Sequence, residues 1–133
     1  MQMLTSSQPR SCLLPNVLAF TDGVGPEIHL GTDAGHLLVL TLTIDRVVER
    51  EALVISVYGA TTRDNWMKTP LLVLHERSYC GVYSALLNLS KFPEVQYLRV
   101  HWSMRSLDRR QTPLFEFSVS VERSGARVRS AVA

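Results

Sequence analysis

Three places in this chain have residues whose types and spacing could support catalysis or binding, and the first is a turn bounded by glycines. His29 and His36 flank this turn, which also carries Asp33. Two imidazoles and one carboxylate are ligands that zinc accepts, and a hairpin would bring the three side chains together. His29, Asp33 and His36 are therefore the candidate metal ligands, and ordinary surface histidines beside a turn are the alternative.

Cys80 is the second chemical candidate, because His75 precedes it by only a few residues. A neighbouring imidazole can convert a thiol to the nucleophilic thiolate. However, the chain has no Gly-x-Ser-x-Gly elbow, no phosphate-binding loop and no hydrolase signature around the pair. We interpret Cys80 as a small buried core residue. The sequence thus predicts no catalytic residue and no cofactor.

A polar loop with a tryptophan is the third place of interest, and it points to binding rather than catalysis. Asp64, Asn65 and Trp66 are adjacent in a segment rich in polar residues. An indole ring beside polar groups could stack on a sugar or insert into a protein partner. The alternative is that Trp66 anchors its own loop on the folded domain.

Tyr97, Arg99 and His101 occupy alternate positions and form a second candidate binding surface. Tyrosine and arginine are enriched where proteins bind partners. Arg99 could instead lie over Tyr97 or pair with Glu116, which would make the row structural.

The strand that positions this row is the clearest element in the sequence. From residue 95 to residue 105, apolar and polar residues alternate with a period of two, as a half-buried antiparallel strand requires. The apolar positions of this run are Leu98, Val100, Trp102 and Met104. Similar patterns or short apolar runs predict further strands at residues 17–20, 37–44, 53–58, 71–74, 82–89 and 114–122.

These strands and their turn signals predict an all-β fold, a single antiparallel β-sandwich of about seven or eight strands. The domain should cover residues 16–123, preceded by a flexible arm at 1–15 and followed by a disordered basic tail at 124–133. Immunoglobulin-like and jelly-roll strand orders both fit, and seven strands favour the former. Trp102, Phe115 and Phe117 are expected at the centre of the core.

Composition limits the classes of partner. The chain has 133 residues, of which 46% are hydrophobic and 20% charged, and its net charge is only +2. Such a small charge makes nucleic acid an improbable partner. Two cysteines do not form a secreted disulfide framework, and no signal peptide or apolar run long enough for a bilayer is present. We therefore expect a cytoplasmic protein with no membrane contact.

One further pattern concerns the order of features after Leu37. An Asp64–Trp66 loop, a turn with Gly81 and Tyr83, the strand 97–100 and a final aromatic strand after Pro113 follow one another. This order, over about 85 residues, resembles small uncharacterised β-sandwich modules of bacterial and prophage type. The resemblance implies a structural role and no catalytic residues.

The sequence therefore favours a non-catalytic structural or protein-interaction module whose exposed sheet edges support self-association into a homo-oligomer. A carbohydrate-binding module that uses Trp66 is the alternative. A metal-dependent enzyme is the third hypothesis.

Overall fold

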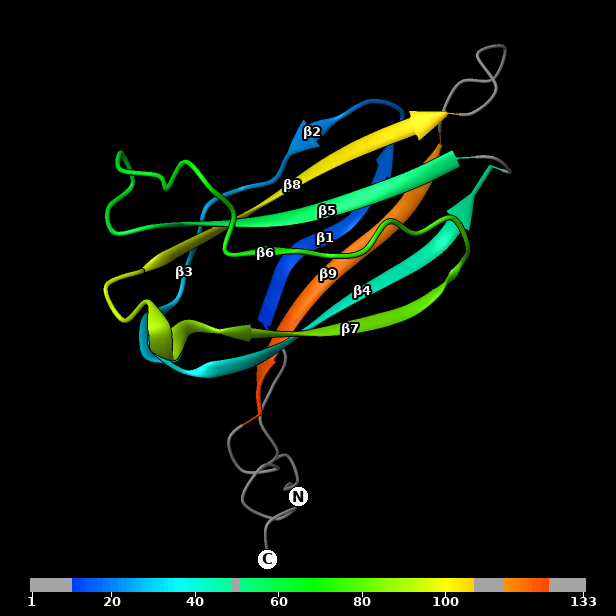
Figure 1. Cartoon of the computed structure of the whole chain (residues 1–133). Coiled ribbons are helices and arrows are strands. Elements are labelled where there is room, and N and C mark those ends of the chain that lie inside the picture. The colour runs from blue at the N-terminus through cyan, green and yellow to red at the C-terminus, as the bar shows by residue number, and fades with distance from the viewer. Residues whose placement is uncertain (1–10, 49–50, 107–113, 125–133) are drawn as a thin grey trace, which may run out of the picture.

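The computed structural model describes residues 11–48, 51–106 and 114–124, and strands dominate them (Figure 1). These described ranges also contain two single-turn 3-10 helices, η2 at Gly31–Asp33 and η3 at Leu89–Lys91. The strands are β1 Ser11–Ala19, β2 Gly23–Val24, β3 Ile28–His29, β4 Leu37–Val47, β5 Glu51–Ala60, β6 Leu72–Val73, β7 Gly81–Asn88, β8 Tyr97–Ser106 and β9 Phe115–Arg123. No helix in these ranges is long and apolar enough to cross a membrane.

The strands form two antiparallel sheets packed face to face. One sheet has the order β1-β9-β4-β7 and the other the order β2-β8-β5-β6, with β3 also paired to β8. If β2 and β3 are counted as one interrupted strand, every step along the chain except β5 to β6 crosses between sheets. This is the connectivity of a jelly roll. The predicted all-β sandwich is confirmed, and the preference for an immunoglobulin-like order is wrong.

The core lies between the two sheets and follows the predicted alternation. Leu98 and Val100 of β8 are fully buried, as are Phe115 and Phe117 of β9. Trp102 is only half-buried and lies at the margin of the core, because its indole N–H reaches the carbonyl of Thr21 at 2.9 Å. Trp102 is therefore not as central as predicted.

The folded domain begins earlier than the sequence indicated. β1 starts at Ser11, and Leu13 and Leu14 are buried in the core. Pro15 suggested a loose arm, but β1 is an edge strand, where proline is tolerated, and its register shifts around this residue. Residues 1–10 of the predicted arm lie outside the described ranges.

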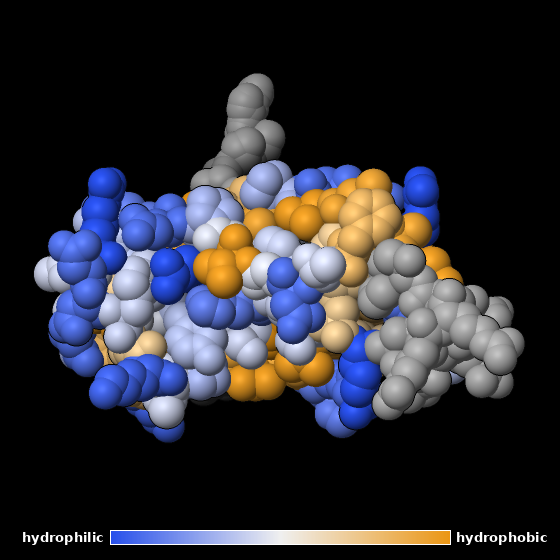
Figure 2. All heavy atoms as spheres, turned by 90° about the horizontal axis from the view of Figure 1, so that it is seen from above, coloured by the Kyte–Doolittle hydropathy of each residue, from blue (hydrophilic) through white to orange (hydrophobic). Residues whose placement is uncertain are grey.

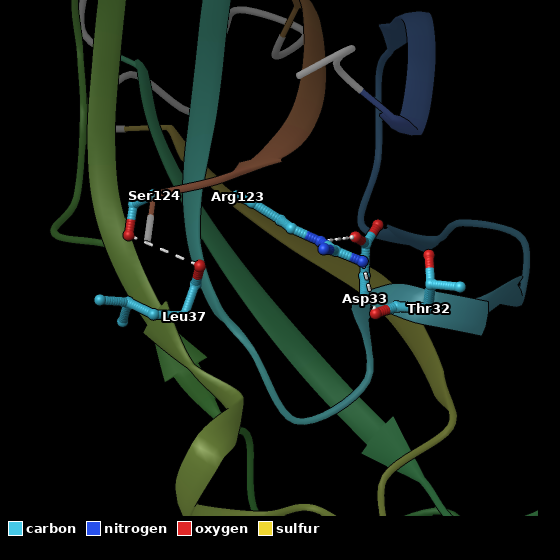
Figure 3. A network of polar contacts seen from close by, with 5 residues as sticks. All are labelled: Thr32, Asp33, Leu37, Arg123 and Ser124. Atoms are coloured by element: carbon cyan, nitrogen blue, oxygen red, sulfur yellow. Dashed lines mark hydrogen bonds and ion pairs between the residues drawn. The ribbon is translucent and has the colours of Figure 1, made fainter. Parts of the chain in front are cut away.

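The end of β9 is fixed by polar contacts to the segment before β4 (Figure 3). The Arg123 Nε donates to Asp33 Oδ1 at 2.8 Å, and Nη2 donates to the carbonyl of Thr32 at 2.6 Å. Ser124 is buried, and its backbone N–H donates to the carbonyl of Leu37 at 3.1 Å. Ser124, which the sequence assigned to the tail, therefore belongs to the folded domain, and residues 125–133 of the predicted tail lie outside the described ranges.

Candidate functional site

The two predicted groups of binding residues meet on the outward face of the β5–β8 sheet. Leu98 and Val100 point into the core, so Tyr97, Arg99 and His101 must point outward. The loop after β5 folds back on the sheet, where Trp66 forms an isolated bridge with Ala60. This bridge brings the loop tryptophan beside the β8 row.

Arg99 stacks on Trp66 rather than on Tyr97. Its guanidinium carbon lies 4.1 Å from the centroid of the indole ring, which is a close cation–π contact. Glu116 belongs to the other sheet and contacts Arg46 and Asn16 instead. Neither alternative partner that the sequence suggested for Arg99 is the one used.

Further aromatic contacts extend the row in both directions. The rings of Tyr58 and His101 are 4.2 Å apart between centroids, and those of His29 and Tyr97 are 5.1 Å apart. Tyr58 was absent from the predicted site. Tyr58 follows the inward-facing Val57 in the chain, so the alternation of a strand already indicated that its side chain points outward. Its place beside His101, however, depends on the register between β5 and β8.

Most of this surface is engaged in contacts within the chain. The Trp66 indole N–H donates to the carbonyl of Arg63 at 2.8 Å, and the Asn65 amide donates to the hydroxyl of Thr61 at 3.1 Å. One face of the Trp66 ring is covered by Arg99. These contacts match the role of Trp66 as an anchor for its loop. Because Arg99 covers one face of the indole ring, that face is not free to stack on a sugar. Carbohydrate binding through Trp66 stays a prediction.

The environment of His101 disfavours the protonated form of its imidazole ring. Its Nε2 is buried and has no hydrogen-bond partner within the described ranges. Burial of the ring and, second, the positive charge of Arg99 lower the pKa of His101 below its usual 6.5. The folded protein therefore favours the neutral imidazole.

We expect acid to destabilise the protein partly through His101. The unfolded chain takes up a proton at this residue near pH 6.5, and the folded chain does so only at lower pH. The free energy of unfolding should thus fall as the pH drops from about 7 through this window. Denaturant titrations at several pH values should give a flatter dependence for His101→Gln, since the other histidines are common to both proteins. An identical slope in the two proteins would contradict the expected contribution.

The predicted metal ligands do not assemble. No group of three or more His, Cys, Asp or Glu side chains within the described ranges could hold a metal ion. Asp33 is paired with Arg123 (Figure 3), and the ring of His29 packs against Tyr97. The zinc hypothesis for His29, Asp33 and His36 therefore has no matching geometry.

Cys80 is exposed, so its interpretation as a buried core residue is wrong. Cys80 directly precedes β7 and is an even number of residues away from Val82, Ser84 and Leu86, which point outward. Alternate residues of a strand face the same side, which explains why Cys80 is exposed. Cys12 is also exposed, and neither thiol forms a disulfide.

The free edge of β7 is a second candidate site. β7 pairs with β4 along its whole length, and no strand of the described residues lies on its other side (Figure 1). The bond from the Leu89 N–H to the carbonyl of His36, at 3.1 Å, sets the hydrogen-bonding parity of this pair. Odd-numbered residues of β7 therefore bond to β4. The N–H and C=O groups of Val82, Ser84 and Leu86 point away from the sheet.

The other three sheet edges are protected against pairing with another chain. β1 carries Pro15 and two register shifts, while β2, β3 and β6 have only two residues each. Short strands, prolines and irregular registers are the usual protection of an edge. β7 has eight residues, none of them charged and none proline.

The outward side chains of β7 add apolar surface to its open backbone. Val82 is 67% exposed and Leu86 is 61% exposed. Figure 2 looks down on the β2 side of the molecule, where hydrophobic patches also occur among hydrophilic residues, but the edge strands there have only two residues each. β7 therefore combines an unpaired backbone with exposed apolar side chains.

No protein-family model matches the chain, and no curated protein matches it. A solved structure that does match is described as "Structure of infectious bursal disease virus Gx strain". The TM-score is 0.53 and the sequence identity 9%, and the match covers 86% of this chain. It covers 32% of the viral chain, so this chain spans about a third of that length. At this identity the likeness shows a shared β-fold and nothing more specific.

Proposed function

We propose that this chain is a non-catalytic structural module that assembles with copies of itself through the free edge of β7. The observation that carries the proposal is the contrast between β7 and the three protected edges. Unpaired N–H and C=O groups on an edge accept another strand, and main-chain hydrogen bonds then provide affinity. A second copy of the chain always offers such a strand.

The chemistry of β7 favours another β7 as its partner. The strand carries no charge, so two copies meet without repulsion between like charges. Its exposed Val82 and Leu86 would lose contact with water on pairing, which is favourable at about 25 cal/mol per Å² of apolar surface. Jelly-roll sandwiches also serve as viral capsid and lectin domains, and this analogy of fold is consistent with a structural role.

The solution mass of the protein tests this proposal. The wild-type mass should rise with concentration above that of one 14.9 kDa chain. Leu86→Lys places two ammonium groups at the paired edges and should weaken association at least tenfold, while the exposed position leaves the fold intact. Light scattering over a series of concentrations measures both effects.

Val73→Lys is the matched control, because Val73 is an equally apolar, 52% exposed residue on the two-residue edge strand β6. This variant should associate like the wild type. A wild-type protein that stays monomeric at every concentration would overturn the proposal, and so would equal weakening of association by Leu86→Lys and Val73→Lys.

A further inference from the structure

We infer that two copies pair β7 against β7 in antiparallel orientation, about a two-fold axis that passes through Ser84. This inference rests on the proposed function and adds the orientation and the register of the interface. A two-fold axis makes the contact isologous, so the same edge serves both copies and the assembly closes as a dimer.

Hydrogen-bonding parity restricts the possible registers. In an antiparallel pair, the residues that exchange two hydrogen bonds must both direct their backbone groups toward the partner strand. On the free side of β7 these residues are Val82, Ser84 and Leu86. With the axis at Ser84, this residue faces its own copy and Val82 faces Leu86 of the second copy. The pairing then forms about six backbone hydrogen bonds.

The side chains favour the same register. Val82 and Leu86 are the two exposed apolar residues of the strand, and the Ser84 axis places them directly opposite each other on both sides of the centre. Cross-strand apolar neighbours stabilise a sheet and shield each other from water. A shift that centres the axis on Ala85 sets Leu86 against Ser84 and leaves Val82 against Asn88. The Ser84 register therefore buries more apolar surface.

The edge is held in an extended conformation before any partner arrives. The Tyr83 hydroxyl donates to the carbonyl of Tyr79 at 2.7 Å, and the Arg77 guanidinium carbon lies 4.4 Å from the centroid of the Tyr83 ring. These contacts fasten the segment that leads into β7, and the full pairing with β4 holds the strand itself. Little conformational entropy remains to be lost on pairing, which favours association.

Cysteine cross-linking tests the register directly. The background is the full chain with Cys12→Ser and Cys80→Ser, since both natural thiols are exposed. In this background Ser84→Cys should form a disulfide-linked dimer under mild oxidation, because directly paired residues lie about 5.5 Å apart between Cα atoms, within the range of a disulfide. Ser84 is exposed, so the substitution leaves the fold intact.

Leu86→Cys is the matched control, because its copy would lie about four residues away along the partner strand, roughly 13 Å distant. This variant should stay unlinked alone and should cross-link when mixed with Val82→Cys. Cross-linking of Leu86→Cys alone, or failure of Ser84→Cys in a protein whose mass is dimeric, would overturn the register but leave self-association in place. If the background protein stayed monomeric and none of the cysteine variants cross-linked, alone or mixed, both the register and self-association would be overturned.

Discussion

Replacing Phe117 by alanine is expected to lower the free energy of unfolding by about 3–5 kcal/mol. Phe117 lies on β9, a central strand of its sheet, and its side chain has no exposed surface. Its ring forms a T-shaped contact with Trp102 of the opposite sheet, with 5.7 Å between ring centroids. The substitution removes apolar contacts to both sheets and leaves a cavity that two paired layers cannot easily close.

Denaturant-induced unfolding of the wild type and Phe117→Ala gives this difference directly. Phe117→Leu is the control, since it keeps most of the volume and should cost clearly less. If Phe117→Ala unfolded at the same denaturant concentration as the wild type, the two sheets could not pack through this ring as the structure places it.

Replacing Glu51 by methionine is expected to raise the free energy of unfolding by roughly 1–4 kcal/mol. Glu51 begins β5 on the same inward face as Leu53 and Ile55, and only 1% of its surface is exposed. Neither of its carboxylate oxygens has a hydrogen-bond partner within the described ranges. Burying a carboxylate without a partner costs free energy, and an apolar side chain of similar length avoids this cost.

Thermal and denaturant unfolding of Glu51→Met measure the gain. Glu51→Gln serves as the comparison, because it removes the charge but keeps polar atoms at the same buried position, and its gain should be smaller. A loss of stability in Glu51→Met would contradict the prediction, because it would mean that the carboxylate makes a favourable contact in the folded protein.

The long strands could be predicted because one buried face imposes a period of two on their residues. β4, β5, β8 and β9 all show this pattern, and their inward residues form the core. β2 and β3 have two residues each, too few for any periodicity. Glu51 interrupts the apolar pattern at the start of β5, so the strand predicted at residues 53–58 does not include it.

Strand order and contacts between distant residues could not be predicted in the same way. The groups Asp64–Trp66 and Tyr97–His101 were identified separately, but their meeting depends on the bridge between Ala60 and Trp66. The position of β7 at a sheet edge follows from topology and leaves no mark in local composition. Once the strand order shows that β7 is an edge strand, its lack of charged residues indicates an edge that is not protected against pairing.

Amide hydrogen exchange at Val82, Ser84 and Leu86, followed as the protein concentration increases, tests self-pairing of β7 most directly. In the isolated chain these three N–H groups point away from β4 and should exchange rapidly. Pairing predicts that their exchange slows with concentration, whereas Tyr83 and Ala85, already bonded to β4, stay protected throughout. Exchange at the three residues that does not change with concentration, or new protection along β1 instead, would contradict assembly through this edge.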